Sequence, residues 1–330
     1  MLKNSSLELL QDKKNLLAFS AGVDSTALFF ILLQNKIDFD IAIVNYNIRE
    51  QSKEEVEYAK ELAELHNLKY YTLNAAKVDK NFEAHAREIR YDFFEELINK
   101  YCYENLLTAH HLGDRFEWML MQFCKGAGCA ELAGMQEATK RSNYTLLRPL
   151  LHLDKQELLS FLNSHNIKYF EDESNADEDI KRNSFRHKHS TPLLEKHLAG
   201  IKKSFEYLDE DRSTLIQETD LKTVGEFAYF KSSQTLRSDI FTIDKYLKSQ
   251  HYILSADERA LLKSENTLVV GRKFVVNKEH GFVFVAPFLK MEKLSKKFKE
   301  KMRLLKVEPK LRGYLYKNED ALETITQILL

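Results

Sequence analysis

The 330-residue sequence contains little of what builds flexible linkers, disulfide frameworks or membrane spans. Four prolines and ten glycines leave no Pro- or Gly-rich linker between its parts. Three cysteines without a C-x-x-C pair argue against a disulfide framework and a four-thiolate zinc site. The longest strongly apolar run, residues 27–33, is too short for a bilayer, and no basic and apolar signal-peptide regions open the chain. We therefore expect a cytoplasmic protein with no membrane partner.

Two nucleotide-binding motifs and a large net charge of either sign are also missing. There is no G-x-x-x-x-G-K-[ST] motif and no G-x-G-x-x-G motif, which argues against a P-loop NTPase and a dinucleotide-binding fold. The formal net charge of −1 gives no indication of nucleic acid, so such a partner must be inferred from local patches. The length predicts two domains.

Residues 16–33, LLAFSAGVDSTALFFILL, contain two apolar runs around a short polar segment. The first run predicts a buried strand and the second a buried helix, with oxygen-bearing caps at the helix start. Gly22 is expected to provide a positive φ or a close backbone approach in the turn. Because open N–H groups at a helix N-terminus bind anions, the segment predicts a phosphate site. The alternative is an ordinary capped turn. The residues of this predicted phosphate site are Ser20, Ala21, Gly22, Val23, Asp24 and Ser25.

Strand-like and helix-like segments alternate through the first half of the chain. Strands are predicted at 16–19, 40–46, 69–73, 106–109 and 144–151, and helices at 26–33, 53–66, 81–101, 114–124 and 155–165. This alternation is typical of an α/β parallel sheet covered by helices on both faces, with ligands beyond the carboxyl ends of its strands. From about residue 195 the pattern becomes helical, followed by a β-hairpin formed by 266–276 and 281–287.

Two further segments supply charged groups near that edge of the sheet. In LLTAHHLGDRFEW, His110 and Asp114 follow a strand, and a carboxylate beside phosphate suits Mg²⁺. The alternative is a helix cap with two surface histidines. In AHAREIRY, Arg87 and Arg90 share one side of a helix and are suited to phosphate, or form a solvated basic edge.

Two basic segments are candidates for contacts to RNA. The first lies in residues 170–189, where Arg182, Asn183 and Arg186 follow an acidic run. The second is residues 290–317, with eleven basic residues against three acids, an excess of +8. Leu294, Phe298, Met302 and Leu305 recur there at helical spacing, which predicts a docked apolar stripe and a cationic face. A solvated helix is the alternative.

Seven motifs in register resemble those of the tRNA(Ile)-lysidine synthases, within the PP-loop ATP pyrophosphatases. They are the S-A-G-V-D-S loop (20–25), V-N-Y-N-I-R (44–49), A-R-E-I-R-Y (86–91), T-A-H-H-L-G-D (108–114), R-P-L (148–150), E-D-E-S-N (171–175) and R-N-S-F-R-H (182–187). The resemblance covers roughly residues 14–195 and is loose beyond. It implies a Rossmann-like PP-loop catalytic domain, 1–195, and a mainly helical tRNA-contacting region with a hairpin, 196–330.

The chain departs from the family pattern at three places. Ala21 replaces the first glycine of the loop, Asn45-Tyr46 replaces Asp-His, and Gly113 stands where an acid is common.

The resemblance implies ligation of free lysine to C2 of the wobble cytidine in a CAU-anticodon isoleucine tRNA, through an adenylated intermediate. ATP is the second substrate, with the loop of residues 20–25 as its binding site, and Mg²⁺ is the expected metal ion, with Asp24 and Asp114 as metal ligands. We expect Asp24, His110 and Asp114 to act in catalysis, and Arg87, Arg90, Arg182, Asn183 and Arg186 to contact RNA or substrate. The alternatives are another PP-loop adenylating enzyme, such as a tRNA thiolase, and a non-catalytic ATP-binding regulator. The lysine pocket is not predicted, and a homodimer is one alternative for the oligomeric state.

Overall fold

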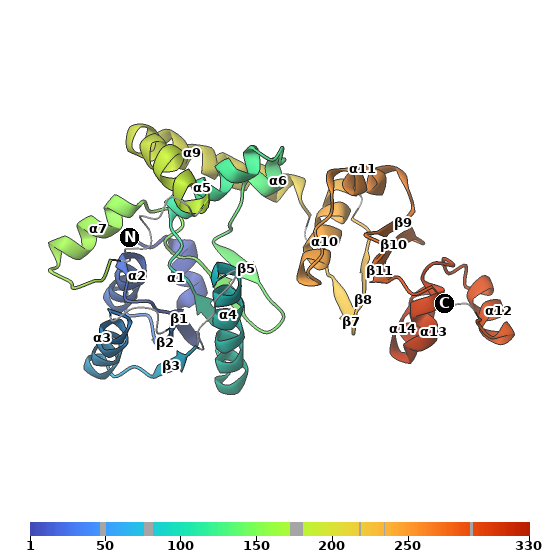
Figure 1. Cartoon of the computed structure of the whole chain (residues 1–330), viewed down its shortest axis with the longest axis horizontal. Coiled ribbons are helices and arrows are strands. Elements are labelled where there is room, and N and C mark those ends of the chain that lie inside the picture. The colour runs from blue at the N-terminus through green and yellow to red at the C-terminus, as the bar shows by residue number, and fades with distance from the viewer. Residues whose placement is uncertain (47–50, 76–81, 172–180, 218, 234, 291–292) are drawn as a thin grey trace. The chain divides into compact units, whose positions relative to one another are not determined.

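The computed structural model describes residues 1–46, 51–75, 82–171, 181–217, 219–233, 235–290 and 293–330. The chain divides into two compact units, Met1–Asp209 and Glu210–Leu330 (Figure 1). Each unit has its own sheet and its own apolar core.

The first unit is built on a sheet with strand order β3-β2-β1-β4-β6-β5. All neighbouring pairs are parallel except β5–β6, which is antiparallel. The strands are β1 (Asn15–Ala18), β2 (Phe39–Asn45), β3 (Tyr70–Asn74), β4 (Asn105–Leu107), β5 (Ala138–Lys140) and β6 (Thr145–Leu147). The predicted parallel sheet is confirmed. The pattern analysis missed β5, since three residues between turns carry no detectable periodicity.

Alternate residues of the strands face two different cores, as a strand buried on both sides requires. Leu17 and Leu107 pack with helices α2, α3 and α7, whereas their neighbours Leu16 and Leu106 pack with α4. Helices therefore cover both faces of this sheet (Figure 1).

The helices of the first unit have the following bounds: α1 (Asn4–Leu10), α2 (Val23–Gln34), α3 (Gln51–Leu65), α4 (Phe82–Tyr101), α5 (Leu112–Phe123), α6 (Cys129–Leu132), α7 (Lys155–Ser164), α8 (Lys181–Phe185), the π-helical turn η2 (Arg186–Ser190) and α9 (Thr191–Leu215). The unit extends beyond residue 195, the boundary predicted from the sequence, because α9 packs on α5. Phe205 of α9 is buried against Leu112 and Phe116.

The second unit contains an antiparallel sheet with order β7-β8-β11-β10-β9. Its strands are β7 (Lys222–Val224), β8 (Phe227–Lys231), β9 (Thr267–Val270), β10 (Phe274–Glu279) and β11 (Phe282–Pro287). The predicted hairpin is present as β10–β11, but its turn lies at His280-Gly281. The segment expected to be one strand is two, because Gly271 and Arg272 both adopt positive φ and turn the chain between β9 and β10. The short β7–β8 hairpin was missed in a region that was expected to be helical.

Helices of the second unit are α10 (Leu236–Ser249), α11 (Ala256–Ser264), α12 (Lys296–Leu304), α13 (Arg312–Lys317) and α14 (Glu319–Leu329). The apolar stripe predicted for residues 290–317 is confirmed: Phe298 and Met302 are buried, with Leu294 and Leu305 packed against the same core. Across the described residues of both units, no helix combines the length and apolarity needed to cross a membrane.

Candidate active site

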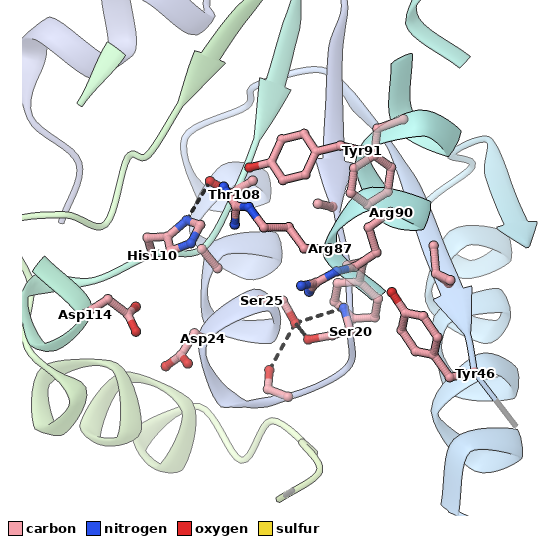
Figure 2. Close-up of a pocket in the computed structure, with 16 residues that line it drawn as sticks. Ser20, Asp24, Ser25, Tyr46, Arg87, Arg90, Tyr91, Thr108, His110 and Asp114 are labelled. Carbon is pink, nitrogen blue, oxygen red and sulfur yellow. Dashed lines mark hydrogen bonds between the residues drawn. The ribbon is translucent and has the colours of Figure 1, made fainter. Parts of the chain in front are cut away.

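A cavity of about 280 Å³ opens at the carboxyl ends of β1, β2 and β4 (Figure 2). The chain runs outward from β1 through β2 to β3, then returns to β4 on the other side of β1. Ligands of open α/β sheets bind at such a reversal of strand order. The cavity is lined by Ala18, Phe19, Ser20, Gly22, Asp24, Ser25, Val44, Tyr46, Arg87, Arg90, Tyr91, Phe94, Thr108, Ala109, His110 and Asp114.

The loop between β1 and α2 is ordered by its own serines. The Ser20 and Ser25 hydroxyls lie 3.0 Å apart, and the Ser20 N–H donates to Ser25 Oγ at 3.2 Å. Ser25 Oγ also donates to the Gly22 carbonyl at 3.2 Å. Gly22 is the N-cap of α2 and has no side chain to satisfy the first N–H groups of the helix. The helix therefore starts with amides suited to an anion at the floor of the cavity.

The strained residue of this loop is Ala21, not Gly22. Ala21 has φ +59°, whereas Gly22 has φ −73° and ψ 167°, which any residue adopts. The expectation that Gly22 provides a positive φ was therefore wrong. A Cβ on Gly22 would meet Ser20 Oγ at 3.5 Å and the Phe170 carbonyl at 3.9 Å, both ordinary contacts. The positive φ falls where the family has its first glycine.

Helix α4 brings both of its predicted arginines to the cavity. Both line it, and Figure 2 shows the Arg90 side chain reaching toward Ser20 and Ser25, whereas that of Arg87 extends toward Thr108 and Tyr91. The Arg87 guanidinium also lies over the Tyr91 ring, 4.8 Å from its centroid. Tyr46, at the end of β2, donates its hydroxyl proton to the Ala86 carbonyl at 2.7 Å and so links α4 to the sheet. Burial raises the pKa of Tyr46, opposed in part by Arg90, so the hydroxyl stays protonated as a donor.

His110 lies beside the same cavity and is held in its neutral form. Its Nδ1 is 2.9 Å from Thr108 Oγ1. Burial lowers the pKa of His110 to about 4; Asp114 opposes this shift, whereas Arg148, Arg182 and Arg87 add to it. At neutral pH the site therefore contains an uncharged imidazole.

Asp24 and Asp114 lie on the same side of the cavity (Figure 2). The His111 ring is close to both carboxylates. His111 Nε2 is 4.0 Å from Asp24 Oδ2 and 3.6 Å from Asp114 Oδ2. The His111 ring caps α5 by accepting the Gly113 N–H at Nδ1 over 3.0 Å, so a neutral ring carries its proton on Nε2, toward the carboxylates. A Cβ at position 113 would lie 2.6 Å from His111 Cε1. Glycine at this position therefore admits the observed ring orientation.

Asp114 and Glu117 share two arginines from the segment after α7. Asp114 Oδ1 accepts Nη2 of Arg182 at 3.1 Å and of Arg186 at 3.3 Å. Glu117, one turn further along α5, accepts Nε of both arginines, that of Arg186 at 2.9 Å. Burial alone would raise the pKa of Asp114, but His111, His110, Arg182 and the His111 N–H hold it well below its usual range. Asp114 is therefore ionised.

The predicted RNA-contacting residues thus fall into two groups. Arg87 and Arg90 line the cavity, whereas Arg182 and Arg186 lie outside its lining and pair with buried carboxylates. Asn183, which lies between the two arginines in the sequence, is buried. The π-helical turn that begins at Arg186 is a feature frequent at functional sites. Parts of two motifs, 47–49 and 172–175, lie outside the described residues, as does Glu292 of the basic segment.

Three residues of this region were missed by sequence reasoning. Glu117 had a usable signal, because an acid three residues after Asp114 lies on the same side of the helix. His111 was given no role, and the alternative interpretation placed it on the surface, yet it is buried. Lys155 had no local signal: it reaches Asp24 Oδ1 at 2.7 Å from a helix 131 positions further along the chain.

The carboxylates fit a metal ion that arrives with phosphate better than one bound by protein alone. In the ranges that the structure describes, no group of three His, Cys, Asp or Glu side chains converges as a metal site. Both Asp114 oxygens accept hydrogen bonds, whereas Asp24 is one-third exposed and its charged partner Lys155 is also exposed. Mg²⁺ commonly uses one or two carboxylates together with substrate phosphates. The contacts therefore favour Asp24 as its protein ligand.

The fold and cavity define a PP-loop protein, and the family described as a PP-loop domain matches residues 2–192. The solved structure of the U34-tRNA thiolase of Methanococcus maripaludis superposes with a TM-score of 0.52 and 16% identity, covering 65% of this chain and 76% of that one. At this identity the likeness concerns the fold alone.

Curated relatives give the narrower assignment. The tRNA(Ile)-lysidine synthases of Campylobacter jejuni and Wolinella succinogenes are both 43% identical, covering 96% and 94% of this chain and 97% and 94% of their own lengths. That of Helicobacter pylori strain 26695 is 41% identical over 94% of this chain and 91% of its own. The chain belongs to the tRNA(Ile)-lysidine synthase family, which confirms the resemblance seen in the motifs.

Proposed function

We propose that this chain ligates free lysine to C2 of the wobble cytidine in an isoleucine tRNA with a CAU anticodon. The observation that carries the proposal is one cavity that combines a serine-rich loop (residues 20–25, the anion loop), two arginines, a neutral histidine and an ionised aspartate. The chain is also related to lysidine synthases over nearly its full length. In the first step cytidine O2 attacks the α-phosphorus of ATP and pyrophosphate leaves. In the second step the lysine ε-amine attacks C2, loses a proton, and AMP leaves.

The anion loop is assigned to the nucleotide. The amides at the start of α2 and the hydroxyls of Ser20 and Ser25 would hold the pyrophosphate part of ATP. Arg87 and Arg90 would compensate charge on the triphosphate or on the RNA backbone from the opposite wall. Because His110 is neutral, it can approach the α-phosphate without adding a fixed charge. Thr108 occupies Nδ1, which leaves Nε2 for the substrate.

Mg²⁺ is part of this proposal. When bound, it would neutralise charge on the leaving pyrophosphate. Asp24 would hold it, as the accessible carboxylate beside the loop. Asp114 was also predicted as a ligand; its present contacts give it a second task, to hold Arg182 and Arg186 in place through ion pairs that also involve Glu117.

Pyrophosphate release tests the function against its two alternatives. We expect release that depends on ATP, the isoleucine tRNA and Mg²⁺, and incorporation of labelled lysine into the RNA. A thiolase would show no lysine incorporation, and a non-catalytic regulator would bind ATP without pyrophosphate release. Asp24→Asn should abolish adenylation with the fold intact, whereas Asp114→Asn should also lower stability because it weakens buried ion pairs.

The second unit is proposed to hold tRNA phosphates through the basic face of α12. Lys296, Lys297, Lys299 and Lys301 are all exposed on this helix, whereas Phe298 and Met302 are buried. Each phosphate contact releases counterions, so the affinity for tRNA should fall steeply with salt.

Replacing these four lysines with serine should raise the tRNA KM and flatten the salt dependence by about one unit of slope per lost contact, with the ATP KM unchanged. Replacing Lys245, Lys248, Lys263 and Lys273, which lie elsewhere on the second unit, serves as the control. A wild-type salt slope in the α12 variant would assign the helix to a solvated surface.

A further inference from the structure

Lys155 is a cation close to the anion loop, and the proposed reaction gives it no role. It occupies the first turn of α7, and its Nζ lies 2.7 Å from Asp24 Oδ1. The position of this turn is fixed. Asp154 and Glu157 form a reciprocal capping box, and Leu158 and Leu162 pack in the same core as α2.

The segment that follows α7 is bound directly to the loop. The Phe170 N–H donates to the Ala21 carbonyl at 3.0 Å, and Gly22 and Phe170 form a parallel β-bridge. Helix α7 and the segment after it therefore pack against the anion loop and α2, and Lys155 lies at the end of α7 nearest Asp24.

The ion pair between Lys155 and Asp24 is accessible to a competing ligand. The side chains are 42% and 32% exposed, and a pair this exposed contributes little to stability. A lysine ammonium has three rotatable donors on a flexible stem, so it can turn from a carboxylate to a nearby phosphate.

We propose that Lys155 is a further phosphate-binding residue, which exchanges Asp24 for the β- or γ-phosphate when ATP and its metal ion bind. In the free protein Lys155 neutralises Asp24. With ATP bound, Asp24 turns to the metal ion and the released ammonium contacts the pyrophosphate part of the substrate. The inference rests on the proposed function insofar as the ligand is ATP.

The test compares ligands with and without the β- and γ-phosphates. Binding of Mg·ATP, magnesium pyrophosphate and AMP is measured by titration calorimetry on the full chain carrying Lys155→Met. We expect ATP and pyrophosphate to bind about tenfold to hundredfold more weakly, the range for a lost charge-assisted hydrogen bond, with AMP unchanged. Lys155→Arg should recover much of the affinity.

Lys202→Met is the matched control, since Lys202 pairs at the same 2.7 Å distance with Glu157 of the same helix and not with Asp24 of the anion loop. It should leave all three affinities unchanged. Equal affinities of wild type and Lys155→Met for ATP and pyrophosphate would overturn the inference, as would an equal loss for AMP. Failure of the wild-type chain to bind ATP would instead contradict the proposed function.

Discussion

The buried carboxylate of Glu117 allows a quantitative test of how the site is held together. It is 1% exposed and accepts Nε of both Arg182 and Arg186, while Asp114 accepts a second nitrogen from each. Among the residues that the structure describes, these two carboxylates thus pair with both guanidinium groups. Glu117→Gln removes one charge and places an amide donor against an arginine donor.

The expected loss follows from the exposure of the partners. Breaking a fully buried ion pair by removing one partner costs about 3–5 kcal/mol. Arg182 and Arg186 are 37% and 28% exposed, so water replaces part of the lost interaction. We therefore expect Glu117→Gln to lower the free energy of unfolding by roughly 2–3 kcal/mol.

Urea denaturation measures this loss, and Glu104→Gln supplies the control. Glu104 pairs with Lys13 at 2.7 Å on the same unit, but both side chains are about half exposed. Its replacement should cost less than about 1 kcal/mol and should matter less at 1 M salt, whereas the Glu117 effect should persist. Equal, small effects of the two substitutions would refute the claim that these carboxylates fix the arginines.

Three further predictions concern residues around the cavity. Ala21→Gly removes a strained positive φ, worth about 1–2 kcal/mol, but adds unfolded-state entropy of roughly 0.5–1 kcal/mol, so thermal unfolding should show a net stabilisation between zero and about 1.5 kcal/mol. Gly113→Ala should displace the His111 ring and lose its cap, costing roughly 1 kcal/mol in urea, whereas the control Gly200→Ala, in open helical space, should stabilise. The pKa of His110 is lowered to about 4, so the contribution of its neutral form to stability is present above pH 6.5 and is lost as the pH falls toward 4. This loss amounts to at most about 3 kcal/mol. It should be absent from the curve of stability against pH of His110→Asn.

Much of the first unit could be predicted because its signals are local. The apolar runs 16–19 and 106–109 are strands buried on both faces, and such strands show as short continuous hydrophobic segments. The order of strands and helices then requires a parallel sheet with ligands at its carboxyl edge, where Ser20 and His110 do lie.

What could not be predicted depends on contacts between distant parts of the chain. Lys155 meets Asp24, and Arg182 meets Glu117, only because α7 and α8 return to the ends of α2 and α5. The sequence of a basic run is the same whether its side chains contact RNA or pair with buried acids. In the second unit, β7 is three residues long, below the length at which alternation can be recognised.

The departures from the family pattern at Tyr46, Gly113 and Ala21 each come with a contact close to the cavity. Tyr46, where the family has histidine, fixes the carbonyl of Ala86 and thereby the helix that carries Arg87 and Arg90. Gly113, where an acid is common, leaves room for the His111 ring beside the two carboxylates. Ala21 retains the backbone conformation suited to glycine, with its carbonyl bonded to Phe170. Tyr46, Gly113 and Ala21 therefore each take part in packing next to the anion loop, whose serines and Asp24 line the cavity.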